Sequence, residues 1–191
     1  DNYRDLLYNQ TSSSYTIKFS EISYNQNNQC ANIIPGQEDL TLVKSRIVKN
    51  PIHISKIIEV EGQKVGYLMY NQFVGVVESE GKDYNSELNN VFSNFLSNGI
   101  NDLVVDLRYN PGGRISTSIN LASMITGQFN NQVFAKERWN SKLMNYWDEN
   151  SPESLINRFT NKLSNNESLF SLNLNRVFVL TSSRTASASE L

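Results

Sequence analysis

A run of small and hydroxyl-bearing residues near the C-terminal end of the sequence could supply a nucleophile. The run has the sequence TASASE over 185–190 and closely follows the apolar stretch 176–180. Small residues let a chain turn sharply from a strand into a helix, and a serine at a helix start directs its oxygen toward unpaired N–H groups. Those groups favour the charge that develops on an attacked carbonyl, so Ser187 is a candidate nucleophile. Serine and threonine are also common at ordinary helix starts, and the run alone does not decide between the two interpretations.

A second candidate is the sequence DLRYNPGG over 106–113, which begins within another apolar stretch, 103–107. Paired glycines let a backbone approach a substrate closely and present N–H donors to it. Gly112 and Gly113 could equally form a tight turn that needs positive φ angles. The two runs together are far more specific than either alone.

The elements that would position these runs form a β-α-β unit. Apolar stretches such as 103–107 are typical of strands buried on both faces of a parallel sheet. The preceding segment has apolar residues at helical spacing, and Gly99 follows it where a left-handed helix cap belongs. The residues at helical spacing are Leu88, Val91, Phe92, Phe95 and Leu96. Before this helix, alternating residues around 52–60 and 64–70 predict a hairpin.

The rest of the sequence also divides into short elements. Before the hairpin, the predicted elements are a short helix within 1–8, a strand over 15–19, a polar linker over 23–39 with Pro35-Gly36 and a strand over 40–48. After the glycine run they are a helix from 115 that closes at Gly127, a strand over 132–138, a helix that begins at Ser151 and continues through Leu163, and a buried strand over 176–180. The predicted fold class is therefore α/β.

Composition excludes several classes of function. The chain has 191 residues with 39% hydrophobic ones, enough for one sizeable core. Lysine and arginine total 17 against 19 aspartates and glutamates, and a net charge of -2 predicts no nucleic-acid partner. The single cysteine, Cys30, allows neither an intrachain disulfide nor a cysteine-based metal site, and we expect no metal or other cofactor. Apolar runs are too short for a transmembrane segment.

Taken in order, the two runs resemble the C-terminal processing (tail-specific) serine peptidases. The resemblance lies in LVVDLRYNPGG over 103–113 and in VLT and TASASE some seventy residues later, and it covers roughly 51–191. Gly66-Tyr67-Leu68 with Asn71-Gln72-Phe73 is similar to the strand that leads into the catalytic domain of Bacteroidetes-like members. Residues 2–19 resemble, less specifically, the last helix and strand of a PDZ module.

The resemblance implies a ClpP/crotonase-like βαβ core, incomplete at its C-terminal end, and three parts of the chain. These are the C-terminal part of a PDZ-like module over 1–25, a linker and connecting strand over 26–50, and the N-terminal part of the catalytic domain over 51–191. It also implies a Ser/Lys dyad that cleaves polypeptides near their C-termini. A polypeptide is thus the expected partner, and the periplasm or cell envelope the expected location.

The resemblance also assigns roles to individual residues. Ser187 matches the nucleophile, the Ala188 N–H matches one half of the oxyanion hole, and a Gly112 or Gly113 N–H would supply the other half. Ser189 and Glu190 match positions that we interpret as structural. Three polar residues of the glycine run are expected to hold its turn by side-chain hydrogen bonds, because buried polar groups need partners. They are Asp106, Arg108 and Asn110.

The general base is the part of the dyad that the sequence does not supply. The resemblance places a lysine well beyond the serine run, and nothing follows Leu191. We therefore expect no lysine or histidine at hydrogen-bond distance from Ser187, and a chain that is inactive alone. His53, the sole histidine, could suggest a Ser/His pair but has no acidic neighbour in sequence. Three upstream lysines are interpreted as surface residues. They are Lys136, Lys142 and Lys162.

Two other classes of function compete with a peptidase. One is a non-catalytic peptide-binding protein that captures extended chains along the PDZ-like edge and the groove of the sheet. The other is an acyl-transfer enzyme of the crotonase fold, which needs glycine N–H donors but not Ser187. A lysine on a strand beyond the serine run would favour the peptidase over the first of these.

Overall fold

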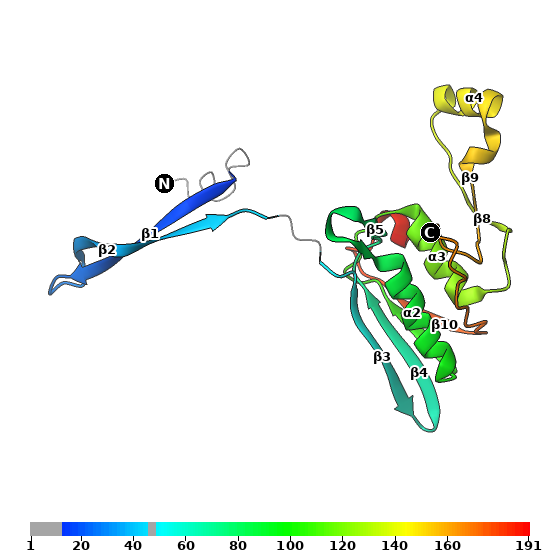
Figure 1. The fold of residues 1–191 in the computed structure, drawn as a ribbon, viewed down its shortest axis with the longest axis horizontal. Coiled ribbons are helices and arrows are strands. Elements are labelled where there is room, and N and C mark those ends of the chain that lie inside the picture. Colours follow the sequence, from blue (N-terminus) through cyan, green and yellow to red (C-terminus); the bar gives the residue numbers. More distant parts are fainter. Residues whose placement is uncertain (1–12, 46–48) are drawn as a thin grey trace. The chain divides into compact units, whose positions relative to one another are not determined.

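The structure is a computed structural model that describes residues 13–45 and 49–191. The chain divides into two compact units, residues 1–49 and residues 50–191, which are considered separately below. Figure 1 shows the course of the chain through its helices and strands. The helix predicted within residues 1–8 lies outside the described residues.

The first unit contains a long antiparallel hairpin. Strand β1 (Ser14–Tyr24) pairs with β2 (Cys30–Val43), from Ser14 opposite Val43 to Tyr24 opposite Cys30. The side chain of Asn25 closes the turn, because its Oδ1 accepts hydrogen bonds from two backbone N–H groups, those of residues 27 and 29. The linker predicted over 23–39 is therefore wrong.

The reason lies in how the hairpin accommodates Pro35-Gly36. The register of the pairing shifts between Lys18 and Ser20, so that the proline and glycine fall in an irregular stretch. An irregular stretch tolerates a residue without a backbone N–H donor, which a regular ladder does not. The sequence over 23–39 is polar because the hairpin surface is largely exposed to solvent, not because the chain there lacks structure.

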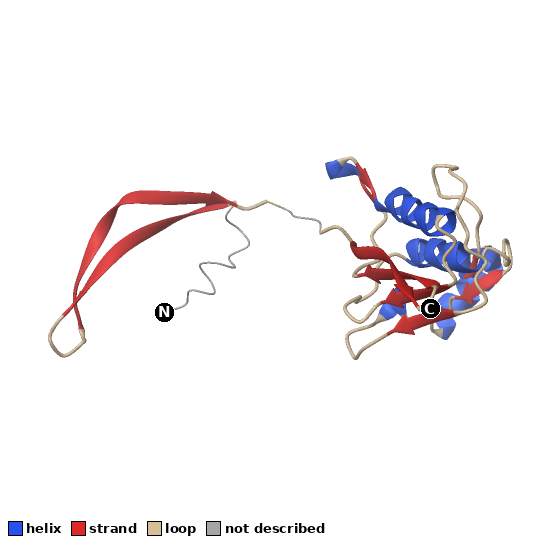
Figure 2. Ribbon diagram, turned by 90° about the horizontal axis from the view of Figure 1, so that it is seen from below, coloured by secondary structure: helices blue, strands red, loops and turns tan. Residues whose placement is uncertain are grey.

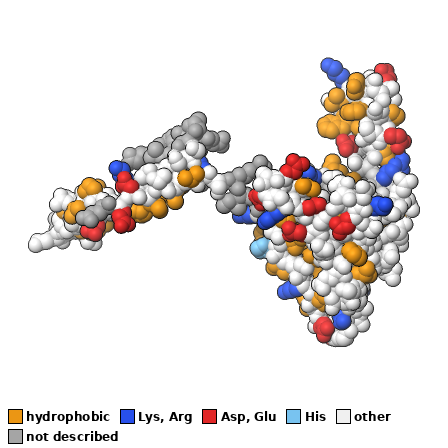
Figure 3. All heavy atoms as spheres, viewed as in Figure 1, with side chains coloured by type: hydrophobic (Ala, Val, Ile, Leu, Met, Phe, Trp, Pro, Cys, Tyr) orange, Lys and Arg blue, Asp and Glu red, His pale blue; other side chains and the backbone are white. Residues whose placement is uncertain are grey.

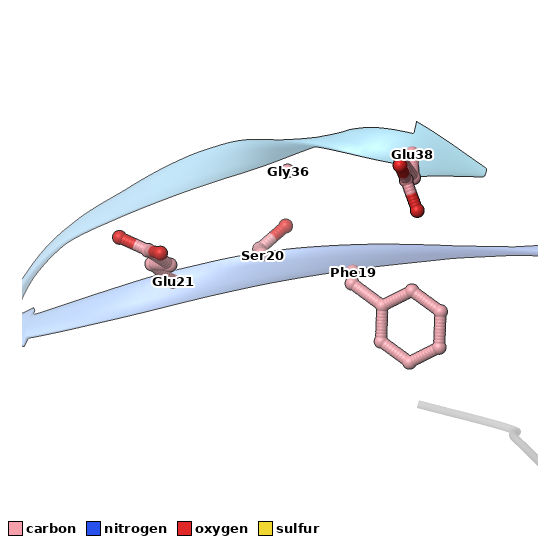
Figure 4. A pocket seen from close by; sticks show the side chains of 5 residues that line it. All are labelled: Phe19, Ser20, Glu21, Gly36 and Glu38. Atoms are coloured by element: carbon pink, nitrogen blue, oxygen red, sulfur yellow. The ribbon is translucent and has the colours of Figure 1, made fainter.

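An open pocket of about 400 Å³ lies at this irregularity. Figure 4 shows that its lining comes from both strands of the hairpin. The lining residues are Phe19, Ser20, Glu21, Gly36 and Glu38. This pocket belongs to the unit that holds neither of the two runs with catalytic potential, so it has no part in the candidate site.

A four-stranded sheet organises the second unit. Its strands are β3 (Ile52–Val60), β4 (Gln63–Tyr70), β7 (Asp102–Asp106) and β10 (Val177–Leu180), in the spatial order β10-β7-β4-β3. β3 and β4 form the predicted hairpin, whereas β4, β7 and β10 run parallel. The three parallel strands therefore end at the same edge of the sheet.

Helices α2 (Tyr84–Ser97) and α3 (Ile115–Thr126) cover one face of this sheet (Figure 2). The core joins alternate residues of β4 and β7 to the apolar faces of both helices. Its most deeply buried members are Leu68, Leu88, Phe92, Phe95, Leu103 and Met124. The predicted β-α-β unit and the helix that closes at Gly127 are thus confirmed.

Local signals explain the bounds of α2. Two short strands, β5 (Val76–Val77) and β6 (Lys82–Asp83), flank the 3-10 turn η1 (Glu78–Glu80) and lead into the helix. Asp83 caps the helix start by accepting hydrogen bonds from two backbone N–H groups, those of residues 85 and 86. Gly99 has a φ of 62° just after the helix, as expected for a left-handed cap.

Residues 133–158 form an arm on the second unit. Strands β8 (Val133–Lys136) and β9 (Ile156–Arg158) pair antiparallel, and between them lie α4 (Ser141–Asn150) and the 3-10 turn η2 (Pro152–Leu155). The helix predicted from Ser151 through Leu163 is therefore wrong. No residue of α4 is buried, and hydrophobic side chains gather on the surface of this arm in Figure 3.

The burial expected for the last strand is also wrong. β10 pairs with β7 as predicted, but it is an edge strand of the described sheet. Its four apolar side chains are 38 to 51% exposed. An exposed apolar edge next to a parallel strand is the kind of surface that proteins usually cover.

Candidate active site

The candidate site lies where the three parallel strands end. β7 and β10 finish side by side, and Leu107 N–H donates to the carbonyl of Leu180 at 2.9 Å to close their ladder. The glycine run and the serine run then leave these two ends. A third loop follows β4, and its Phe73 forms a parallel bridge with Gly113. The two runs thus follow neighbouring parallel strands.

Asn110 shapes the glycine turn. Its side chain is fully buried, donates from Nδ2 to the Tyr70 carbonyl at 2.9 Å, and accepts at Oδ1 from Gly112 N–H at 2.8 Å. The turn has φ angles of 102° at Gly112 and 142° at Gly113, a region that favours glycine. Because Gly112 N–H is already bonded to Asn110, Gly113 N–H is the glycine donor that remains.

Ser187 begins a short 3-10 turn, η3 (Ser187–Ser189), in an unusual conformation. Its φ is 57°, a left-handed value that few residues other than glycine, asparagine and aspartate adopt. The Glu190 carboxylate supports this conformation by accepting a hydrogen bond from Ser187 N–H at 3.0 Å. Ser187 is exposed to solvent, whereas its neighbour Ala188 is buried.

The two turns touch directly. A Cβ atom placed on Gly112 would lie 2.7 Å from Ser187 Cβ, 2.7 Å from the Ala186 carbonyl and 3.1 Å from Ala188 N. A Cβ on Gly113 would overlap the carbonyl oxygen of Phe73. The glycines are therefore needed for close packing as well as for their φ angles.

Two backbone donors remain at this contact. Within the part of the chain that the structure describes, neither Ala188 N–H nor Gly113 N–H donates to a protein acceptor. Ala188 directly follows Ser187, and Gly113 directly follows Gly112, the residue whose added Cβ would meet Ser187 Cβ. Unpaired N–H groups of this kind can bind the negative oxygen of a tetrahedral acyl intermediate. Acyl transfer through a serine requires such donors close to a serine hydroxyl.

Comparison with known proteins identifies the family. The sequence profile of "Peptidase family S41" matches residues 64–191, about two thirds of the chain. The chain belongs to peptidase family S41. Family membership supports a serine peptidase, and with it a polypeptide substrate.

One solved structure agrees with this assignment. A Bacteroides fragilis protein classed as an S41 protease is 30% identical, with a TM-score of 0.62 over 94% of this chain and 43% of that protein. A photosystem II D1 C-terminal processing protease is 18% identical over 80% of this chain and 35% of that one, with a TM-score of 0.47. The S41 chain thus spans less than half the length of either structure. No curated protein matched.

Asp106 and Arg108 of the S41 domain bind one another rather than the glycine turn. Asp106 is fully buried, and its carboxylate accepts hydrogen bonds from Arg108 Nη2 and from Tyr67 Oη, each at 2.7 Å. The hydrogen bond from Arg108 is the main cause that lowers the pKa of Asp106 to about 2. The hydrogen bond to Asp106 in turn raises the pKa of Tyr67. Of the three polar residues expected to hold the turn, Asn110 is the one whose side chain bonds it.

No other candidate base hydrogen-bonds to Ser187 among the described residues. His53 lies exposed on β3, at the edge of the sheet opposite β10. The lysines of the arm and of the following loop, Lys136, Lys142 and Lys162, are exposed. Among residues 13–45 and 49–191, no side chain hydrogen-bonds to Ser187 Oγ. The same residues contain no group of three or more acidic, histidine or cysteine side chains that could hold a metal ion. No described helix is long and apolar enough to cross a membrane.

Sequence reasoning missed several residues of the site. The hydroxyls of Ser182 and Thr185 bind carbonyls of the loop after β7, and Tyr67 reaches Asp106 from the adjacent strand. The high density of hydroxyl residues in 181–189 was the available signal for the first two. Nothing local marked Tyr67, because its contact depends on the register between β4 and β7.

Proposed function

We propose that this chain carries the nucleophile and the oxyanion hole of a serine endopeptidase that cleaves polypeptides near their C-termini. The observation that carries the proposal is the contact between the two turns. Ser187, with a φ of 57°, lies where its turn meets Gly112, and one backbone N–H group of each turn, those of Ala188 and Gly113, has no acceptor among the described residues. Membership of family S41 supports the same reaction class.

The reaction would proceed through an acyl-enzyme. Ser187 Oγ attacks the carbonyl carbon of the scissile bond and gives its proton to a general base, while the new oxyanion accepts hydrogen bonds from Ala188 and Gly113. The C–N bond then breaks, and the base returns the proton to the leaving amine. Water attacks the resulting ester in the same way and restores the free serine hydroxyl.

The base in this proposal is a lysine that forms a Ser/Lys dyad with Ser187. No described lysine or histidine hydrogen-bonds to Ser187 Oγ, so we propose that this lysine is not among residues 13–45 and 49–191. A serine hydroxyl without a base is a weak nucleophile near pH 7. The chain by itself would then hydrolyse nothing.

The finer structural assignments belong to the same proposal. The parallel β4-α2-β7 unit with β10 beside it supports a ClpP/crotonase-like core. Residues 1–25 would belong to a PDZ-like module, and β1 is their described strand. A periplasmic or cell-envelope location would suit an enzyme that trims exported polypeptides.

The test uses the complete protein and its Ser187→Ala variant. Labelled casein measures general proteolysis, and a pair of unfolded polypeptides with free or amidated C-termini measures dependence on the chain end. We expect Ser187→Ala to abolish cleavage of all substrates while the melting temperature stays close to that of the wild type, and we expect the wild type to prefer the free C-terminus.

Ser183→Ala is the matched control, because Ser183 is exposed in the same loop. Retained proteolysis in a folded Ser187→Ala protein would refute the assignment of the nucleophile. Equal cleavage of free and amidated substrates would refute C-terminal specificity but not peptidase activity.

A further inference from the structure

The loop that carries Ser187 is fastened to the glycine-turn loop by side-chain hydroxyls. The β7/β10 ladder ends with the bond from Leu107 N–H to the Leu180 carbonyl. Beyond that point, Thr185 Oγ1 donates to the Leu107 carbonyl at 2.8 Å and Ser182 Oγ to the Arg108 carbonyl. The hydroxyls thus continue the pairing of the two chains after the strands have ended.

The same fastening reaches the site itself. Ser189 Oγ donates to the Asn110 carbonyl at 3.2 Å, and Ala186 N–H donates to the same carbonyl at 3.3 Å. Asn110 is the residue whose side chain holds Gly112 N–H. A displacement of the serine loop would therefore change the spacing between the two remaining donors, Ala188 N–H and Gly113 N–H.

Thr185 is the central member of this set. It is half-buried, and its hydroxyl is bonded twice, because Oγ1 donates to the Leu107 carbonyl and accepts from Ser182 N–H at 3.0 Å. It lies two residues before Ser187 and does not reach the reacting atoms through any of these bonds. Its hydroxyl can therefore act on the reaction only by holding backbone.

We propose that Thr185 is a positioning residue of the peptidase, whose hydroxyl, assisted by those of Ser182 and Ser189, holds the Ser187 turn against the glycine turn. This inference rests on the proposed function for its catalytic meaning. The hydroxyls fix the separation of the two oxyanion donors, and a displacement of about 1 Å at such a site can lower a rate by about 100-fold. These hydroxyl bonds join two loops of the chain and leave both donors unbonded, so we expect the defect to fall on the chemical step.

The experiment compares Thr185→Val, Thr185→Ser and wild type in the complete protein, with a fluorophosphonate as the probe. The rate constant for phosphonylation at saturating probe (kinact) and the probe concentration for half saturation (KI) are measured separately. We expect Thr185→Val to lower kinact by about 10- to 100-fold with KI little changed, and Thr185→Ser to restore it. Thr126→Val is the matched control, since Thr126 Oγ1 donates to a carbonyl at 3.0 Å within α3, and its kinact should match wild type.

Hydrogen exchange supplies a readout that needs no activity. We expect faster exchange of the Ala186 and Gly112 amides in Thr185→Val, but not in Thr185→Ser or Thr126→Val. Wild-type kinact and wild-type exchange in Thr185→Val would overturn the proposal, as would an equal loss of kinact in Thr126→Val. If Thr185→Val fails to fold, Ser182→Ala takes its place, because it removes the exposed hydroxyl of the set. We then expect the same changes in kinact and in amide exchange, but smaller ones.

The two proposals fail in different ways. If the wild-type protein is not labelled at Ser187, the proposed function is wrong. Amide hydrogen exchange then still decides whether Thr185 holds the Ser187 turn against the glycine turn. If the wild type is labelled and Thr185→Val behaves identically to it, the proposed function stands and the positioning role is wrong.

Discussion

At the scale of single residues, Asn110 determines which donor the glycine turn offers. Its Oδ1 binds Gly112 N–H, and its Nδ2 anchors the turn to the end of β4. The family resemblance predicted that three polar residues would hold this turn and that a Gly112 or Gly113 N–H would supply one half of the oxyanion hole. It could not say which, because that choice depends on the direction of one amide side chain in the folded protein.

Gly112→Ala tests the contact between the two turns. The added Cβ would lie 2.7 Å from Ser187 Cβ at a φ of 102°, so we expect a loss of stability larger than the roughly 1–2 kcal/mol of a left-handed alanine, with loss of probe labelling. Gly62→Ala is the control, because Gly62 has a φ of 77° and no atom within 4 Å. Urea unfolding of both variants provides the measurement. Equal costs at the two sites would contradict the close contact.

Asp106 gives the stability a pH dependence. Its pKa of about 2 is below the ordinary value of 3.8, so its contribution is present above about pH 4 and is lost as the pH falls toward 2. We expect Asp106→Asn to cost about 1–3 kcal/mol at pH 7, because Arg108 and Tyr67 lose a charged partner. The difference from wild type should shrink as the pH falls to 3 and below.

Urea titrations from about pH 2 to about pH 7, which include both the ordinary pKa of 3.8 and the lowered pKa of about 2, would measure this effect. Asp39→Asn serves as the control, since Asp39 pairs with Lys18 on an exposed surface at 3.5 Å and such pairs contribute little. A constant difference between wild type and Asp106→Asn across this range would show that the carboxylate is not the stabilising form.

At the scale of elements, α2 does more than cover the sheet. Its fully buried Asn89 donates to Glu167 Oε1 at 2.8 Å and to the Ser168 carbonyl at 3.0 Å, and it accepts from Phe170 N–H at 2.9 Å. These bonds fix the long connection between β9 and β10. They thereby help to place the strand that leads to Ser187.

Asn89→Ala should therefore destabilise the protein by about 2–4 kcal/mol, since three hydrogen bonds are lost and their partners are left buried. Asn90→Ala is the matched control on the same helix. Asn90 is exposed, and its replacement should change stability by no more than about 0.5 kcal/mol. The free energy of unfolding of each variant decides the question, and a similar small change in both would contradict the anchoring role of Asn89.

Elements with a strong periodic pattern were predictable, and those set by distant pairing were not. The helix around Phe92 and the strand around Val105 follow from apolar spacing alone. The apolar residues after Ser151 also have helical spacing, yet Ile156 pairs with Lys136 across β8, and Phe159 packs edge-on against Phe134 at 5.2 Å. Contacts far apart in sequence overrode the local pattern there.

At the scale of the whole molecule, the two units are compact in different ways. Every member of the main hydrophobic core lies in residues 50–191, whereas the hairpin of the first unit leaves most of its apolar side chains exposed. A two-stranded hairpin is marginally stable by itself. Its exposed residues gave residues 23–39 their polar, linker-like character, which is why only the end of β2, within the strand expected over 40–48, was predicted.

Deletion of residues 1–49 should leave the second unit folded. The thermal unfolding midpoint of the 50–191 unit should be the same in the full chain and in the truncated one, because residues 13–45, the described part of the first unit, contribute nothing to its core. Leu68→Ala, made in the full chain and in 50–191 alone, checks that the measurement detects damage to this core, since loss of a fully buried leucine costs about 2–5 kcal/mol. A lower midpoint for 50–191 alone would show that the first unit contributes to this core.

The central claim is that Ser187 attacks a carbonyl whose oxygen is held by Ala188 and Gly113. The most direct test is a crystal structure of the complete protein after reaction with a fluorophosphonate. We predict phosphorus bonded to Ser187 Oγ, and the phosphonyl oxygen at about 3 Å from both Ala188 N and Gly113 N. An adduct on Ser189, or a phosphonyl oxygen bound by neither N–H group, would contradict the account.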